Sequence, residues 1–371
     1  MHRGVGRFIH WLETHRDAAG VALERPARAE EVLQLEHQIG MPIPADLRLA
    51  LNHFNGGLTP AGTLLPAGSG PGTIEAALRE IAGRVDADFL DPELLLPFHR
   101  TLEGSLLAFD RSAGPVSDTW PIVDYDEESG EQRLVYRTFD GFCEKCVADW
   151  TAPDFDQEFT LDSYLLQGQR HAQIEPDVAS AHATVAHALR RLGRPEDATA
   201  SYLRAASCVP PLSWCAWEAL KIAALLGQRE EGFEAASRLA SRAPREAWAR
   251  RETTPLRVAE LVALVAQGDP EPGPYLHLLD LLLEAASGEE VAAVGALRVA
   301  LKGGTPLPAP NPPESPSGLL LDANADVAWA QAEAAYHAGA LRDDHLLFER
   351  ELDPLRATHS LGELLRIRRD F

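Results

Sequence analysis

The sequence predicts an α+β protein, in which a domain with an antiparallel sheet flanked by helices is followed by an all-α domain of helical repeats. Two observations support this prediction. In residues 1–150, apolar positions with helical spacing come first, short apolar runs bounded by turn residues follow, and one more helical pattern closes the order. Further along the chain, a set of residues recurs at an offset of 34 positions, which is a period of helical repeat proteins.

Length and charge limit the organisation and the partners of the chain. At 371 residues it exceeds what one hydrophobic core usually serves, so two or three domains are expected. The formal net charge is −22, and such an acidic chain repels a phosphate backbone. We therefore expect no direct binding to nucleic acid.

The compartment is inferred from the apolar segments and the cysteines. The N-terminus has no apolar run of signal-peptide length, and no stretch approaches the roughly 20 apolar residues of a membrane span. Four cysteines do not make a disulfide framework in a chain of this length. We expect a cytoplasmic protein that does not bind membranes.

Two helices are expected near the start of the first domain. One carries the apolar face of residues 32–39 and ends at Gly40. The other follows Pro44, covers residues 47–54 and precedes the triplet Asn55-Gly56-Gly57. Because Asn and Gly tolerate the left-handed conformation of a helix C-cap, the triplet is expected to end this helix.

Four strands and a closing helix are predicted next. Short apolar runs indicate an antiparallel meander over Leu94–Phe98, Ser105–Phe109, Trp120–Tyr125 and Arg133–Arg137, with Ser129-Gly130 as the tip of the last hairpin. Thr138 can cap a helix whose apolar residues fall on one side. That side is expected to close the domain against the sheet.

These residues carry a resemblance to a known family. The run Glu31–Gly57 resembles the opening signature of the SUKH superfamily of Smi/Knr-type domains, and its motif residues are Glu36, Pro44, Asn55, Gly56 and Gly57. Later pieces that are similar to the family are Leu96-Pro97-Phe98, Glu103-Gly104, Trp120-Pro121-Ile122-Val123 and Thr138-Phe139-Asp140-Gly141-Phe142. The resemblance covers about residues 20–150. It implies a binding role, because bacterial members resemble immunity proteins that neutralise toxins of polymorphic or contact-dependent systems, often nucleases.

A repeated pattern occupies residues 179–244. Leu192-Gly193 recurs as Leu226-Gly227, 34 positions later, and Ala198 recurs as Gly232. The segment resembles tetratricopeptide repeats, in which close contact between helices excludes large side chains at such positions. We therefore expect two helix pairs here, with turns at the two Leu-Gly sites.

The remainder of the chain reads as divergent repeats. Leu276–Leu301 and Ala325–Leu352 have the pattern of helical hairpins, and between them Gly303–Gly318 contains six prolines, which break any helix. We predict a SUKH-like α+β domain over residues 1–160. The tetratricopeptide-like domain then covers residues 161–371, with a proline-rich loop at 303–318.

No catalytic signature is present in the sequence. The phosphate-binding loop, the nucleophile elbow and the zinc-protease helix are all absent. Cys143-x-x-Cys146 has the spacing of a metal or redox site, but it lacks a second ligand pair and falls within a helical pattern. Buried reduced thiols are favoured there. We predict no catalytic residue, no metal site and no cofactor.

The main functional signal is an acidic segment. Residues 118–162 contain thirteen acidic and three basic residues, a net charge of −10. Such a field steers a basic partner, whereas the alternative is a solvated face that only aids solubility. The expected partner-binding residues are Asp118, Asp124, Asp126, Glu127, Glu128 and Glu131.

Three functional hypotheses follow. In the first and favoured one, the chain is an immunity protein that binds a basic toxin domain, presenting carboxylates where phosphates would lie. In the second, it is a cytoplasmic scaffold or regulatory adaptor that binds peptides through its helical repeats. The third, an enzyme with an unrecognised site, is disfavoured because no catalytic elements converge. We predict a non-enzymatic protein-binding protein.

Overall fold

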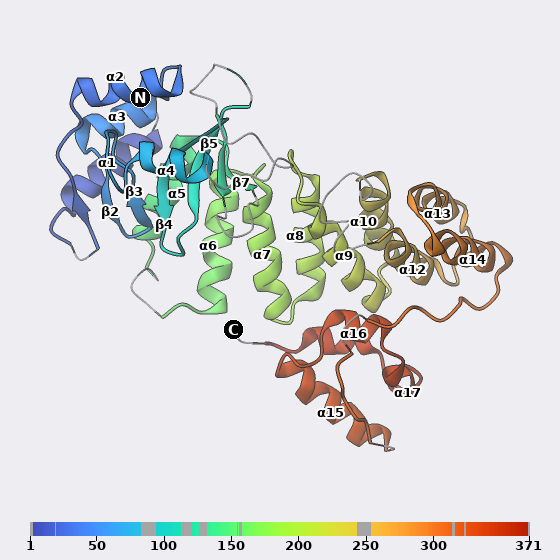
Figure 1. Cartoon of the computed structure of the whole chain (residues 1–371). Coiled ribbons are helices and arrows are strands. Elements are labelled where there is room, and N and C mark those ends of the chain that lie inside the picture. Colours follow the sequence, from blue (N-terminus) through green and yellow to red (C-terminus); the bar gives the residue numbers. More distant parts are fainter. Residues whose placement is uncertain are drawn as a thin grey trace. The chain divides into compact units, whose positions relative to one another are not determined.

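The computed structural model places most of the chain in two compact units (Figure 1). The first comprises Met1–Glu158 and Gln169–Ala181, and the second comprises Phe159–Gly168 and His182–Phe371. The structure describes all residues except 1–2, 19, 83–93, 113, 115–119, 126–131, 154, 156–157, 243–253, 314–315, 323 and 370–371. The predicted fold class is confirmed, since an antiparallel sheet with helices is followed by an all-helical region.

The first unit is built on a seven-stranded antiparallel sheet in which every strand pairs with its neighbour in sequence. The strands are β1 (Ala22–Leu23), β2 (Gly57–Thr59), β3 (Gly62–Leu64), β4 (Leu95–Thr101), β5 (Leu106–Asp110), β6 (Ile122–Tyr125) and β7 (Gln132–Tyr136). The last four form the predicted meander. The first three are two or three residues long, too short for an alternating pattern to reveal them.

Among the described residues of this unit, five helices accompany the sheet. They are α1 (Arg3–Thr14), α2 (Ala29–Ile39), α3 (Ala45–His53), α4 (Ile74–Ala82) and α5 (Phe139–Trp150). Gly40 ends α2 in the left-handed conformation, as predicted. Thr138 caps α5, because its hydroxyl oxygen accepts the backbone N–H of Gly141 at 3.0 Å. A side-chain acceptor at this position satisfies a donor that the first turn of a helix leaves free.

The core lies where α5 covers the sheet. The Phe98 ring of β4 is 4.8 Å from the Phe109 ring of β5 and meets the Phe142 ring of α5 edge-on at 5.3 Å, centroid to centroid. Phe8 of α1 packs against the same helix, with its ring 5.9 Å from the Phe142 ring and 5.4 Å from the Trp150 ring. Aromatic pairs in such geometries add about 0.5–1.5 kcal/mol beyond their burial. The helical face predicted for α5 is therefore the face that closes the domain.

The helical repeats follow the predicted period. After α6 (Leu161–Ile174) come α7 (Ala179–Arg191), α8 (Pro195–Ser207), α9 (Ser213–Leu226) and α10 (Arg229–Arg242). Helices α9 and α10 each begin 34 residues after their counterparts α7 and α8. Gly193 and Gly227 turn the chain at φ values of 74° and 68°. Ala198 is fully buried, and a Cβ atom at Gly232 would lie 2.8 Å from Val265, so both positions require small residues.

The rest of the second unit is helical but less regular. Its elements are α12 (Pro255–Ala266), α13 (Gly273–Ala285), α14 (Glu289–Gly303), α15 (Ala325–His337), α16 (Asp343–Phe348), η4 (Arg350–Leu352), α17 (Asp353–Arg356) and η5 (Leu361–Arg366). Helices α13 and α14 form the predicted hairpin. The second helix expected in 325–352 is the six-residue α16, whose first residue Asp343 forms an ion pair at 2.6 Å with buried Arg190 of α7.

Candidate protein-binding site

Glu36 holds the turn between α2 and α3. Its carboxylate accepts a hydrogen bond from the backbone N–H of Ile43 at 2.8 Å and forms an ion pair with Arg48 of α3. Only 14% of the Glu36 side chain is exposed. Pro44 occupies the N-cap position of α3. These two motif residues therefore set how the chain enters α3, because a carboxylate with one donor from the turn and one from α3 fixes the geometry between them.

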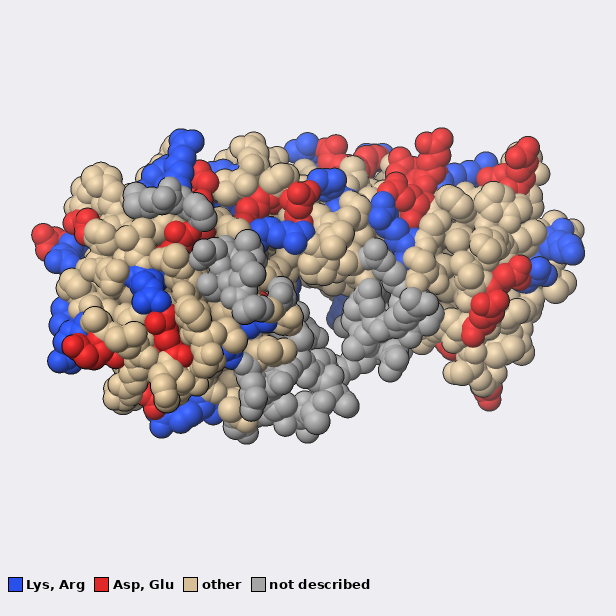
Figure 2. Space-filling view, turned by 90° about the horizontal axis from the view of Figure 1, so that it is seen from above, with Lys and Arg blue, Asp and Glu red and all other residues tan. Residues whose placement is uncertain are grey.

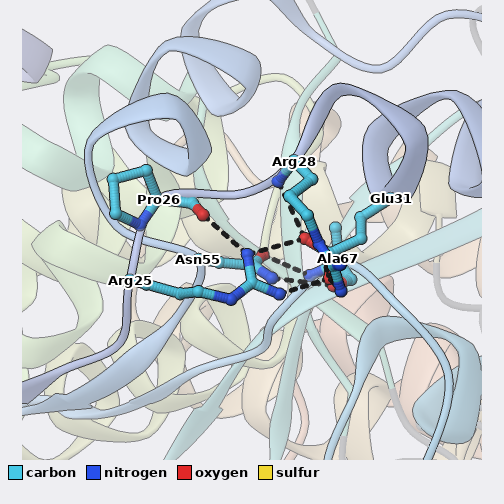
Figure 3. Close-up of polar contacts among 6 residues, drawn as sticks. All are labelled: Arg25, Pro26, Arg28, Glu31, Asn55 and Ala67. Atoms are coloured by element: carbon cyan, nitrogen blue, oxygen red, sulfur yellow. Dashed lines mark hydrogen bonds and ion pairs between the residues drawn. The ribbon is translucent and has the colours of Figure 1, made fainter.

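Asn55 fastens the end of α3 to the segment after β3 (Figure 3). The side chain is 3% exposed, its amide nitrogen donates to the Ala67 carbonyl oxygen at 2.9 Å, and its oxygen accepts the Ala67 N–H at 2.8 Å. The predicted left-handed cap at Asn55 is wrong, because α3 ends at Phe54 in an extended conformation. A buried amide that bonds both groups of one peptide unit serves as an inter-segment link instead.

Gly56 and Gly57 allow the backbone to approach neighbouring strands. Their φ values are 84° and 128°, in the region that favours glycine. A Cβ atom at Gly56 would lie 2.7 Å from the Leu64 carbonyl oxygen, and one at Gly57 would overlap the Ala22 carbonyl oxygen of β1. The two glycines are therefore required by close packing at the start of β2.

Glu31 gathers two arginines at the start of α2 (Figure 3). It accepts the Arg28 backbone N–H at 2.8 Å and both terminal nitrogens of Arg25, at 3.0 and 2.5 Å. The hydrogen bonds from Arg25, followed by the one from the Arg28 backbone, lower the pKa of Glu31 to about 2. We did not single out this cluster in the sequence. Its signal is a glutamate at the third helical position, which can reach back to the residue before the helix.

These four features tie α2, α3 and the first strands into one framework. Residues 26–145 match the SMI1 / KNR4 family (SUKH-1). The match confirms the resemblance and contains every motif residue named above. A search of curated proteins gave no match. The first unit thus has a SUKH-1 segment that begins just before α2 and ends within α5.

Only one of the six predicted partner-binding acids lies among the described residues of the SUKH-1 segment. Asp124 is on β6, with 21% of its side chain exposed, and forms an ion pair at 2.8 Å with Arg133 of β7. The others lie outside the described residues, at 118, 126, 127, 128 and 131, as does the predicted hairpin tip at 129–130. Four of them fall in the sequence between the end of β6 and the start of β7. Asp124 therefore serves a contact between strands.

Most other described acids of the segment 118–162 also have partners within the chain. Asp140 accepts the Val5 N–H at 2.9 Å, Glu144 pairs with Arg7 at 3.5 Å, Asp149 binds His171 at 2.8 Å, and Asp162 pairs with Arg368 at 3.2 Å. On the face shown in Figure 2, acidic and basic side chains lie next to one another in many places. Glu144 and Asp162 thus each have an arginine of the chain as partner, while Asp140 and Asp149 accept hydrogen bonds within it.

The cysteine pair of α5 is buried in the core. Cys143 and Cys146 are free thiols, 0% and 6% exposed, and burial raises the pKa of both thiols. A thiol with a raised pKa is a poor nucleophile and a poor metal ligand. No group of three or more His, Cys, Asp or Glu side chains among the described residues could hold a metal ion. Nor is any helix in the described part of the chain long and apolar enough to cross a membrane.

A buried ion pair joins α5 to the segment after α6. Lys145, with 2% of its side chain exposed, contacts Glu175 at 2.7 Å and donates to the Val135 carbonyl oxygen at 3.3 Å. A shift in pairing between β6 and β7 leaves Val135 without a strand partner, and Lys145 satisfies its carbonyl. Burial lowers the pKa of Lys145. At Gly141 a Cβ atom would overlap the Glu175 carboxylate, which accounts for this glycine.

Proposed function

We propose that this chain is a non-enzymatic protein-binding protein, a cytoplasmic immunity protein that neutralises a bacterial toxin of a polymorphic or contact-dependent system. The observation that supports this role is the SUKH-1 match over residues 26–145. The family resemblance implies immunity proteins among bacterial members. The residues that build the matched segment act as structural links, which suits a domain that presents a surface for binding.

The proposed binding surface is the acidic run between β6 and β7. Residues 126–131 contain four acids and no base. A toxin that binds nucleic acid has a basic surface, and carboxylates can occupy the positions of phosphates on it. Asp124 is assigned a different role, because its ion pair with Arg133 already compensates its charge. Asp118 remains a candidate contact by its position in the sequence.

The test reverses charge without disturbing a described contact. In the full chain, Asp126→Lys, Glu127→Lys and Glu128→Lys are combined, and a control combines Asp17→Lys, Glu24→Lys and Glu103→Lys. The three control residues are exposed acids of the same unit, and the change in charge is identical. The partner is the protein that the immobilised wild-type chain captures from its own cells.

The readout is the association rate over a range of ionic strengths. We expect the acidic-run variant to associate about tenfold or more slowly at low salt, with the difference shrinking as salt rises, because steering by charge is screened. The control should change the rate by less than about twofold, and both variants should keep the unfolding midpoint. Equal rates for the two variants would remove the acidic run from the binding site. Capture that depends on the helical repeats instead would favour the scaffold hypothesis.

A further inference from the structure

A proline-rich segment lies against the repeat helices of the second unit. Residues 305–313 have no regular secondary structure and follow α14 (Figure 1). Arg257 of α12 donates to two of their carbonyl oxygens, Asn311 at 2.7 Å and Pro312 at 2.5 Å. Glu260 of α12 accepts the Asn311 N–H at 2.9 Å and pairs with Arg257 at 3.2 Å. Arg257 and Glu260 of α12 thus bind both the carbonyl oxygens and an N–H group of the segment's backbone.

A second carboxylate holds the segment further along. One oxygen of Glu349, a residue that is 2% exposed, accepts the Ser317 backbone N–H at 3.0 Å and its hydroxyl at 2.8 Å. The other carboxylate oxygen is buried and has no partner among the described residues. All but one of these contacts are made to the backbone. The site therefore selects an extended main chain more than particular side chains.

A cavity of about 550 Å³ remains beside the segment. Its walls include Leu261 and Leu264 of α12 and Leu225 of α9, while Pro306 and Pro308 line it from the segment. The segment therefore does not fill the groove in which it lies.

The charged residues that line the cavity are balanced. Glu260 and Asp353 lie with Arg350 and Arg356, so the sum of their formal charges is zero. Asp353 and Arg356 also form an ion pair with each other. A strongly charged ligand gains nothing from such a lining, whereas an apolar, uncharged peptide matches it.

We propose that this groove binds an extended, proline-containing peptide of a protein partner, and that residues 305–313 are its intramolecular occupant. Prolines predispose a peptide to an extended conformation, so little conformational entropy is lost on binding. Prolines also lack backbone N–H donors, so a proline-rich peptide offers mainly carbonyl oxygens for hydrogen bonding. Arg257 donates to two of these oxygens. The groove and the acidic run at 126–131 share no residue. The proposal of peptide binding therefore does not depend on the proposal of toxin binding.

The test uses a fluorescent peptide with the sequence of residues 305–313. It is added to the full wild-type chain and to a full-length variant in which these nine positions carry a glycine-serine linker. A tethered occupant competes at an effective concentration in the millimolar range. We therefore expect the linker variant to bind the peptide at least about tenfold more tightly than the wild type. Equal affinities for the two chains, or no binding to a folded linker variant, would overturn the proposal.

Two substitutions in the linker variant identify the groove. Arg257→Lys keeps the charge beside Glu260 but loses the planar fork that reaches two carbonyl oxygens, so affinity should fall about tenfold. Arg238→Lys, on α10, should leave it unchanged. A peptide with alanine at every proline should bind at least about tenfold more weakly. Unchanged affinity in Arg257→Lys or in the alanine peptide would exclude the proposed recognition.

Hydrogen exchange of the wild-type chain covers the case in which the linker variant fails to fold. Excess peptide should increase exchange at the amide of Asn311, which donates to Glu260, because the occupant is displaced. Protection of this amide that stays constant up to millimolar peptide would count against the groove.

Discussion

His99 should make the stability of the first unit depend on pH. It lies in β4, is 1% exposed, and neither of its ring nitrogens has a hydrogen-bond partner among the described residues. The ring packs 5.5 Å from the Phe142 ring, centroid to centroid, and a Cβ atom at Gly62 would lie 3.0 Å from its Cε1. Burial lowers the pKa of His99 to about 3. The folded unit thus holds a neutral imidazole in an apolar core.

The direction and size of the effect follow from proton linkage. An unfolded chain protonates histidine near pH 6.5, whereas folded His99 stays neutral until about pH 3. Between these values the unfolded state binds more protons, so stability falls as pH falls, by up to about 1.4 kcal/mol per pH unit. From pH 7.5 to pH 5 the loss from this single residue is about 2 kcal/mol.

His99→Leu tests this, because leucine has a similar volume and no nitrogen to protonate. The unfolding free energy of the first unit is measured at pH 7.5 and pH 5 from hydrogen exchange of β4 and β5 amides. From pH 7.5 to pH 5, the unfolding free energy of the wild type should fall by about 2 kcal/mol more than that of the variant. His10→Gln, at an exposed position of the same unit, should show no such difference from the wild type. A difference below about 0.5 kcal/mol for His99→Leu would show that the folded state accommodates the proton, and would refute the reasoning.

Three further predictions concern the repeats, the domain boundary and the buried ion pair of α5. Ala198→Leu should overpack the contact of α8 with its neighbours and cost about 1–3 kcal/mol in thermal unfolding; a neutral result would mean that the repeat register is shifted. The boundary at residue 160 stays a prediction, and we expect limited proteolysis to cut at 160–178 or in the proline-rich segment before it cuts within 94–150. A fragment of residues 1–160 should be about 3–5 kcal/mol less stable than one of residues 1–181, because it leaves Lys145 buried without Glu175; equal stability would show that this ion pair contributes nothing.

Local signals in the sequence predicted local structure well. Thr138 caps α5 because a hydroxyl at that position meets a donor three residues later. The recurrence of 34 residues gives two helix pairs with turns at Gly193 and Gly227, because each pair is one packing unit. In each case the residues that interact are close in sequence or repeat in it.

Contacts between distant residues could not be predicted in this way. The position of Asn55 after a helical pattern predicts a helix cap, but its side chain forms hydrogen bonds with the backbone of Ala67, after β3. The residues described after α14 in the proline-rich loop form no helix, as predicted, yet Arg257, which binds this loop, lies 54 residues before Asn311. The sequence pattern around Asn55 or Asn311 does not indicate either of these distant partners, Ala67 and Arg257. A sequence read by periodicity therefore shows which segments fold regularly and misses what the irregular ones bind.

The same limit changes the interpretation of the acidic segment. Its net charge of −10 is a property of the sequence, but an acid steers a partner only when no cation of the chain cancels its field. Asp124 has such a cation in Arg133 at 2.8 Å, and Asp149 has one in Arg170 at 3.4 Å, 9 and 21 positions away. Compensation of this kind reduces an ion pair to a short-range dipole. The proposal of partner binding therefore rests on the run of four acids at 126–131, where the sequence itself supplies no base.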